Sequence, residues 1–292
     1  MPHQEHTIEA ADGINLFSER WLPDGDPKFV VVVAHGGAEH VGRYAGMAKR
    51  WNAAGGLVIG ADHRGQGKSE GSKGHVDHFE TFARDLRTVI DKTAADLPAS
   101  SRPDALPWFL FAHSMGGLIG LVYLLDHEQA VPLRGAMISA PLIEPAVDVG
   151  AVKRFAANVL MTVAPKVALP TGIPADHISR DSEAVAAYVA DTRRVDVLSA
   201  GWLRAMLAAV ARVEAEVQSV QLPMRWYLGT GDKICNADAT RRVFRTIPEA
   251  QAKEREQTLL EFDGYYHELH NEPEALREPI LAMLDAWIAE RL

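Results

Sequence analysis

The sequence predicts an α/β protein with a mostly parallel central sheet, helices on both faces of that sheet, and a helical segment inserted between two of its strands. Two observations support this prediction. Short β-branched runs alternate with helical patterns along the first half of the chain, which is typical of a parallel sheet. The alternation stops at Leu142, gives way to an Ala- and Val-rich helical pattern, and resumes after Gln221. With 292 residues, 47% of them hydrophobic, the chain is long enough for both parts.

The elements of the first half follow in a regular order. The run Lys28–Ala34 is nearly all apolar and β-branched, as expected for a strand that is covered on both faces. In a parallel sheet of this kind the ligand site lies at the carboxyl ends of the strands. The expected order is a hairpin (Thr7–Ala10 and Asn15–Trp21), a strand (Lys28–Ala34), a helix (Arg43–Ala54), a strand (Leu57–Ala61), a Gly-rich loop (Asp62–Gly74), a helix (His78–Leu97), a strand (Trp108–Ala112), a helix ending near Glu128, and a strand (Gly135–Ala140).

The second half contains the inserted segment and the end of the sheet. Residues 142–221 are expected to form a helical cap, whereas residues 1–141 and 222–292 form the core. The sheet is expected to resume at Met224–Leu228 and again at Thr258–Phe262, and a last helix is expected over Pro273–Arg291.

A candidate nucleophile lies at the end of the strand Trp108–Ala112. Small residues stand two positions before and two positions after Ser114, in Ala112-His113-Ser114-Met115-Gly116. This pattern between a strand and a helix is typical of a sharp turn that exposes a serine hydroxyl above the sheet. The common pattern has glycine at the first small position, so Ala112 is a mild departure. An ordinary serine in a strand–helix turn is the less favoured interpretation.

A serine nucleophile requires a base and a carboxylate that orients the base. Where the serine lies on a strand–helix turn of this kind, the expected order along the chain is serine, acid, histidine. Asp232 comes directly after the strand Met224–Leu228, and His267 follows the strand Thr258–Phe262. We therefore expect Asp232 to be the acid and His267 the base. Asp238 and Asp263 are rival acids, but the first lies further into the following helix and the second is only four residues from His267. His113 is expected to be structural.

The loop His35-Gly36-Gly37 follows the first buried strand. It is expected to supply one oxyanion donor from the backbone N–H of Gly37, and the N–H of Met115 is expected to supply the other. A plain tight turn is the alternative for this loop.

Several other classes of function are disfavoured. The formal net charge is −9 with dispersed Lys and Arg, so no nucleic-acid partner is expected. The sequence lacks the spacing of a P-loop, a dinucleotide-binding fingerprint or a zinc helix, so neither cofactor nor metal is expected. The single cysteine, Cys235, excludes an intramolecular disulfide. No signal peptide or membrane span is evident near the N-terminus or elsewhere, so a cytoplasmic protein is expected, with peripheral membrane contact left open.

Taken together, these motifs resemble the monoacylglycerol lipase family of α/β hydrolases, also described as lysophospholipase-like. The resemblance is collinear over nearly the whole chain. A nucleophile motif of this kind is common to many esterases, whereas the Glu-His-x-Gly-Arg-Tyr run and the second histidine three residues after His267 are more specific. The matching segments are His35–Tyr44, Asp62–Ser69, His113–Gly117, Ile178–Asp181, Ala187-Tyr188, Gly231–Cys235 and Tyr266–His270.

The resemblance implies an esterase that cleaves a single acyl chain from glycerol, a small lipid ester substrate. It also implies that Glu39, Arg43, Tyr188 and His270 form the polar end of the pocket, where glycerol hydroxyls need donors and acceptors. A structural ion pair between Glu39 and Arg43, four residues apart, is an equal alternative. Other serine hydrolases, namely a lysophospholipase, a general carboxylesterase, a thioesterase or an aminopeptidase, carry the same triad. A non-catalytic binding module is disfavoured because all three triad positions are present.

Two further features have alternative interpretations. The resemblance implies that the cap supplies an acyl tunnel, and within it Ala151–Ala164 is apolar with two basic residues near one end. This segment either contacts a lipid surface transiently or packs on the body and lines the pocket. Cys235 matches a family cysteine near the site, which predicts that a bulky thiol reagent lowers activity. The alternative is a loop cysteine without a role.

Overall fold

The computed structural model describes residues 2–146, 161 and 163–292. Within these residues, eight strands form one sheet in the order β1-β2-β4-β3-β5-β6-β9-β10. Only the pairs β1–β2 and β2–β4 are antiparallel, so the mostly parallel sheet predicted from the sequence is confirmed. The strands are β1 (His3–Glu9), β2 (Asn15–Trp21), β3 (Phe29–Ala34), β4 (Gly56–Ala61), β5 (Trp108–His113), β6 (Leu133–Ser139), β9 (Met224–Gly229) and β10 (Thr258–Phe262).

The central strand β3 shows why the apolar run Phe29–Ala34 forms a strand buried on both sides. Val30 and Val32 pack into the hydrophobic core on one face of the sheet, and Val31 and Val33 pack into the core on the other face. Successive side chains of a strand point to opposite faces, so an uninterrupted run of valines fills both cores.

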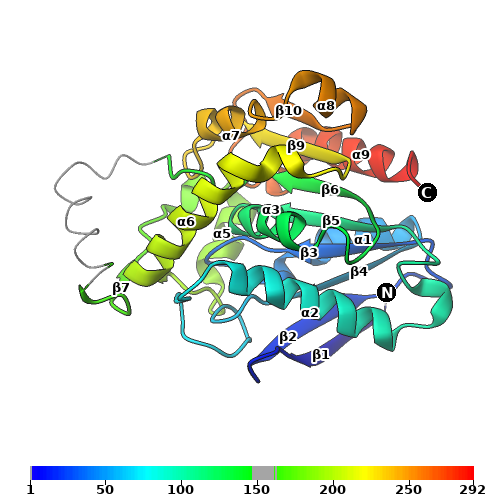
Figure 1. Cartoon of the computed structure of the whole chain (residues 1–292), viewed down its shortest axis with the longest axis horizontal. Coiled ribbons are helices and arrows are strands. Elements are labelled where there is room, and N and C mark those ends of the chain that lie inside the picture. Colours follow the sequence, from blue (N-terminus) through cyan, green and yellow to red (C-terminus); the bar gives the residue numbers. More distant parts are fainter. Residues whose placement is uncertain (1, 147–160, 162) are drawn as a thin grey trace.

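Helices cover both faces of the sheet (Figure 1). Helices α2, α3 and α6 contribute to the larger core, and α1 and α9 contribute to the core on the opposite face. The described α-helices are α1 (Ala45–Ala53), α2 (Glu80–Asp96), α3 (Met115–His127), α5 (Ser182–Ala190), α6 (Ala200–Glu216), α7 (Ala237–Phe244), α8 (Glu249–Glu254) and α9 (Glu274–Ala289). In the described part of the chain, no helix is long and apolar enough to cross a bilayer.

The segment between β6 and β9 leaves the sheet. It contains α5 and α6, together with a small antiparallel pair of strands, β7 (Ala168–Pro170) and β8 (Val197–Ser199), that the helical pattern did not predict. In Figure 1, α6 extends past the main sheet, and β7 lies near its far end. Most of Ala151–Ala164, the segment for which a lipid contact was considered, lies outside the described residues.

The topology brings four loops to one edge of the sheet. Parallel strands β3, β5, β9 and β10 end next to the residues His35, Ser114, Thr230 and Asp263, respectively. Because the carboxyl ends of parallel strands meet at one edge, the loops that carry the predicted site residues converge there.

Candidate active site

Ser114 lies on a sharp turn between β5 and α3. Its backbone has φ of 54° and ψ of −118°, a conformation that is rare for residues other than glycine. The turn is held by the surrounding chain, because the Ser114 N–H donates to the Ser139 carbonyl at 2.9 Å and the Leu142 N–H donates to the Ser114 carbonyl at 2.9 Å. Gly116 lets α3 approach the neighbouring strand, since a Cβ there would lie 2.1 Å from the carbonyl oxygen of Ala34.

Asp232 and His267 form a buried pair on the loops after β9 and β10. The Nδ1 atom of His267 lies 2.7 Å from Oδ2 of Asp232. The other oxygen, Oδ1, accepts the N–H groups of Ile234 at 2.8 Å and Cys235 at 2.9 Å, which fixes the carboxylate. Burial would lower the pKa of His267, but the charge and hydrogen bond of Asp232 outweigh it and raise that pKa above its usual value.

The two rival acids have other partners. Asp238 is exposed on α7 and pairs with Arg241 at 2.5 Å, and Asp263 accepts a hydrogen bond from Thr230 at 2.9 Å. Of the three candidate carboxylates, Asp232 alone contacts His267 in the described residues.

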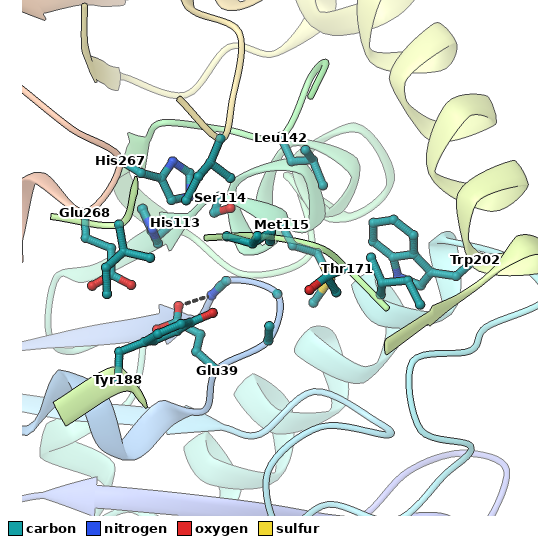
Figure 2. Close-up of a pocket in the computed structure, with 17 residues that line it drawn as sticks. Glu39, His113, Ser114, Met115, Leu142, Thr171, Tyr188, Trp202, His267 and Glu268 are labelled. Carbon is teal, nitrogen blue, oxygen red and sulfur yellow. Dashed lines mark hydrogen bonds between the residues drawn. The ribbon is translucent and has the colours of Figure 1, made fainter. Parts of the chain in front are cut away.

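A cavity brings Ser114 and His267 together with the two predicted oxyanion donors. Gly37 and Met115 line it with them, and a Cβ on Gly37 would lie 3.6 Å from the sulfur of Met115. Met115 is the first residue of α3, so its N–H has no acceptor within the helix. Figure 2 shows Ser114 beside His267, with Met115 on the opposite side of the serine.

Arg43 joins two carboxylates at one end of the cavity. Its Nη1 donates to Oε2 of Glu39 at 2.6 Å and to Oε1 of Glu268 at 2.6 Å, and its Nη2 donates to Oε2 of Glu268 at 2.8 Å. Oε1 of Glu39 in turn accepts the N–H of Gly36 and the hydroxyl of Tyr44. The Glu39–Arg43 ion pair considered from the sequence is therefore present, and Glu39 also anchors the loop that carries Gly37.

The pKa values of the two carboxyl groups shift in opposite directions. Burial raises the pKa of Glu39, and the neighbouring Glu268 adds to this effect although Arg43 opposes it. Burial would also raise the pKa of Glu268, but the charge and the two hydrogen bonds of Arg43 lower it to about 2. Glu268 is therefore a carboxylate at neutral pH.

Of the four residues expected at the polar end, two line the cavity and two do not. Glu39 and Tyr188 line the cavity, whereas Arg43 and His270 are not among its lining residues. Arg43 lies 4.9 Å from the centre of the Tyr188 ring. His270 is buried behind the cavity, where its ring stacks on Tyr44 at 5.3 Å between centroids. Glu268 lines the cavity and was missed, although its place directly after His267 puts it on the same loop.

His113 and Cys235 surround the Asp232–His267 pair. His113 is buried, 4.7 Å from the His267 ring between centroids, and its Nδ1 lies 3.1 Å from the Ser139 hydroxyl. Cys235 is also buried, and burial, together with the charge of Asp232, raises its thiol pKa well above the usual value.

Asp232, Cys235 and His267 are the only described residues that cluster as a metal site would, with ligand atoms within 4.8 Å of one another. The fit to a metal is poor. The His267 nitrogen facing Asp232 is already hydrogen-bonded, and a thiol with a raised pKa resists the deprotonation that metal binding requires.

The other end of the cavity is apolar. Figure 2 shows Trp202 and Tyr188 on opposite sides of the space in front of Ser114. Most of the apolar wall comes from the segment between β6 and β9, with Ile234 from the loop after β9. These lining residues are Leu142, Ile173, Ile178, Leu198, Trp202 and Ile234. Such a wall is suited to a hydrocarbon chain.

One family model, two relatives and one solved structure match this chain over most of its length. The family model described as Serine aminopeptidase, S33 matches residues 25–274. The chain is 32% identical to a monoacylglycerol lipase of Mycolicibacterium smegmatis, over 99% of this chain and 98% of the relative. It is 31% identical to a monoglyceride lipase of Rattus norvegicus, over 100% of this chain and 93% of the relative. The crystal structure of Paleococcus ferrophilus monoacylglycerol lipase matches with a TM-score of 0.79 and 26% identity, covering 95% of this chain and 99% of that one.

Proposed function

Because the chain belongs to the monoacylglycerol lipases among the serine α/β hydrolases, within the family described as Serine aminopeptidase, S33, we propose that it hydrolyses monoacylglycerols through an acyl-enzyme on Ser114. The observation that carries the proposal is the buried contact of His267 with Asp232 at 2.7 Å, in a cavity that Ser114 also lines. A cavity with one polar and one apolar end suits an ester of a polyol with a single hydrocarbon chain.

The proposed reaction has two steps. His267 Nε2 accepts the proton of the Ser114 hydroxyl as Oγ attacks the acyl carbon, and Asp232 orients and stabilises the resulting imidazolium. The N–H groups of Gly37 and Met115 hold the oxyanion. His267 then protonates the departing glycerol oxygen. Water, activated by His267, attacks the acyl-enzyme and releases the fatty acid.

We further propose that residues 142–221 act as a cap that holds the acyl chain. Four residues of this segment support the proposal because they contribute to the apolar wall, namely Ile173, Ile178, Leu198 and Trp202.

Transient contact of the same segment with a lipid surface is supported by exposed apolar side chains, since Val163 is 71% exposed and Leu169 is 45% exposed. Flotation with vesicles of neutral phospholipid tests it. A Val163→Glu variant that floats as well as the natural chain would contradict the proposal.

The acidic polar end also fits the ammonium group of an aminoacyl substrate, which is a second candidate suggested by the family description. Glu39 and Glu268 would pair with that ammonium, as carboxylates do. The apolar wall favours the lipid substrate, so the ester reaction is the first proposal.

The test is hydrolysis of a chain-length series of monoacylglycerols, of p-nitrophenyl esters and of an aminoacyl-naphthylamide. Natural enzyme, Ser114→Ala and the exposed-site control Ser100→Ala are compared. We expect monoacylglycerols to be cleaved fastest and Ser114→Ala to lower kcat by about 10⁴–10⁶, as loss of a triad nucleophile does. A loss below about tenfold would remove Ser114 from the mechanism. Cleavage of the naphthylamide alone would replace the lipase proposal with the aminopeptidase one.

A further inference from the structure

The polar end of the cavity holds two carboxyl groups and one guanidinium. Glu39 and Glu268 share the single guanidinium of Arg43, and all three side chains are nearly buried, with exposures of 3%, 4% and 11%. Charges in such a site are screened far less by salt than charges on the surface. When both carboxyl groups are ionised, a bound molecule therefore meets an excess of negative charge.

The cations near this end are already paired. Both terminal nitrogens of Arg43 donate to the two carboxylates. Arg194 packs on the Tyr188 ring at 3.7 Å and donates to the Tyr188 carbonyl at 2.7 Å and to Asp196 at 2.6 Å. Burial lowers the pKa of His270 to about 4, so its imidazole is neutral at physiological pH. Arg43 and Arg194 thus each pair with a carboxylate and His270 carries no charge, so none of these three side chains is a free cation for an incoming anion.

Glu268 lines the cavity beside His267, the proposed base. It follows His267 directly in the chain and lines the same cavity as Ser114. His267 protonates the departing oxygen in the proposed reaction, so the alcohol part of the substrate lies close to this loop. Carboxylate oxygens accept hydrogen bonds from hydroxyl groups but not from a phosphate, which itself offers only acceptors when it is ionised.

We propose that Glu268, together with Glu39, makes the enzyme selective for esters of uncharged polyols and against esters whose alcohol carries a phosphate. The inference rests on the proposed ester hydrolysis at Ser114 and narrows its substrate class. A phosphate at this end loses its hydration and faces carboxylates without a free cation, whereas glycerol hydroxyls find acceptors. The structure thereby distinguishes the glycerol ester from the phosphorylated lysolipids among the candidate substrates.

Matched decanoyl esters test the selectivity at pH 8. The substrates are 1-decanoylglycerol, its 3-phosphate, and the zwitterionic 3-phosphocholine as a control for head-group size. We expect kcat/KM for the glycerol ester to exceed that for the phosphate by at least about 100-fold, because specificity of this kind arises from unpaired like charges. Glu268→Gln keeps the shape of the side chain and removes one negative charge. It should therefore lower the ratio of kcat/KM for the glycerol ester to that for the phosphate by about tenfold or more, and the corresponding ratio for the phosphocholine by less. Glu278→Gln is the control. It removes a half-exposed carboxylate of α9 that pairs with Arg50 of α1, and it should leave the ratio within about twofold.

Two results would overturn the inference while leaving ester hydrolysis intact. One is equal cleavage of the phosphate and the glycerol ester by the natural enzyme, and the other is an effect of Glu268→Gln no larger than that of Glu278→Gln. Failure of the proposed function looks different, because then neither the glycerol ester nor the phosphate is cleaved, and the inference falls with it.

A competition measurement needs no variant and so covers the case in which Glu268→Gln does not fold. Hydrolysis of p-nitrophenyl butyrate by the natural enzyme is measured at increasing concentrations of glycerol or of glycerol 3-phosphate, at constant ionic strength. We expect competitive inhibition by glycerol and an inhibition constant at least about tenfold higher for the phosphate. Equal or tighter inhibition by glycerol 3-phosphate would overturn the inference.

Discussion

The methyl group of Ala112 faces Gly120 on helix α3, where a Cβ would lie only 2.9 Å from that methyl. Ala112 stands at the position where the nucleophile motif commonly has glycine. The helix accommodates the extra methyl because Gly120 has no side chain. Alanine in place of glycine near the end of β5 is thus matched by glycine on the helix that packs against it. The close approach of β5 and α3 around Ser114 is preserved.

This relationship predicts a specific coupling between the two positions. Gly120→Ala should lower the free energy of unfolding by about 1–3 kcal/mol, because the added methyl overpacks the contact with Ala112. In the Ala112→Gly background the same change should cost much less, since the two methyl groups no longer meet.

Urea unfolding of the four proteins in the double-mutant cycle measures the coupling. Gly46→Ala on α1 is the matched control, because nothing lies within 4 Å of a Cβ there. It should be neutral or stabilising by up to about 1 kcal/mol, through helix propensity alone. If the two substitutions change the free energy of unfolding additively, the contact between Ala112 and Gly120 does not couple the two positions.

Much of the fold follows from local patterns in the sequence. The valine run of β3 and the strand–Ser–helix turn at Ser114 are strong local signals, and the predicted strand at Leu57–Ala61 differs from β4 by one residue. The short strands β7 and β8 were missed because three-residue strands leave too few positions for an alternating pattern to be recognised.

The site is predictable where its residues follow strand ends and less so where their contacts are distant in sequence. Asp232 and His267 could be placed because each comes after a strand. The pairing of Arg43 with Glu268 joins residues 225 positions apart, and no local pattern indicates it. The position of His270 is likewise set by packing against Tyr44 and not by its spacing from His267.

The contact between Asp232 and His267 predicts the pH dependence of activity. In the proposed reaction His267 must be neutral to accept the serine proton, and its pKa is raised above the usual 6.5. The protonated, inactive form therefore persists to higher pH, and the acid limb of kcat/KM should have its midpoint above pH 6.5. Asp232→Asn should lower kcat by about 10⁴ and move that limb to lower pH, because the substitution removes the largest of the charges that oppose the effect of burial on the pKa of His267.

The rival acids provide controls for the Asp232 prediction. Asp263→Asn and Asp238→Asn remove carboxylates that bind Thr230 and Arg241, respectively, and should leave the acid limb in place. A loss at either position equal to that of Asp232→Asn would mean that Asp232 is not the orienting acid.

Burial refines the prediction for Cys235. Its side chain is 2% exposed and its thiol pKa is raised, so alkylation by a bulky maleimide should be far slower in the folded enzyme than in urea. Once formed, the adduct should abolish ester hydrolysis, because the thiol lies within 4.8 Å of the Asp232 and His267 ligand atoms. Cys235→Ala keeps the backbone N–H that binds Asp232 and should resist the reagent. Equal inhibition of both proteins would exclude Cys235 as the target.

Glu272 connects the segment between β6 and β9 to the loop that carries His267. It is fully buried, and its oxygens accept the N–H of Tyr266 at 2.6 Å and both the N–H and the Nε of Arg180 at 3.1 Å. The same two segments also meet where the Glu268 N–H donates to the Ile178 carbonyl at 2.8 Å. Glu272 therefore positions the residue before His267 without touching the cavity.

Glu272→Gln should lower kcat by about 10–100-fold with little change in KM for p-nitrophenyl butyrate, because a small displacement of the His267 loop harms the transition state more than ground-state binding. The acid limb of kcat/KM should stay within a few tenths of a pH unit, since Asp232 still faces His267. Glu274→Gln, two residues further on at the start of α9 and exposed, is the matched control and should retain full activity. All assays are run well below the midpoint of thermal unfolding of each variant, so that a loss of stability is not read as a loss of rate. A Glu272→Gln enzyme with normal kcat and a lower unfolding temperature would show that the carboxylate serves stability alone and does not position the base.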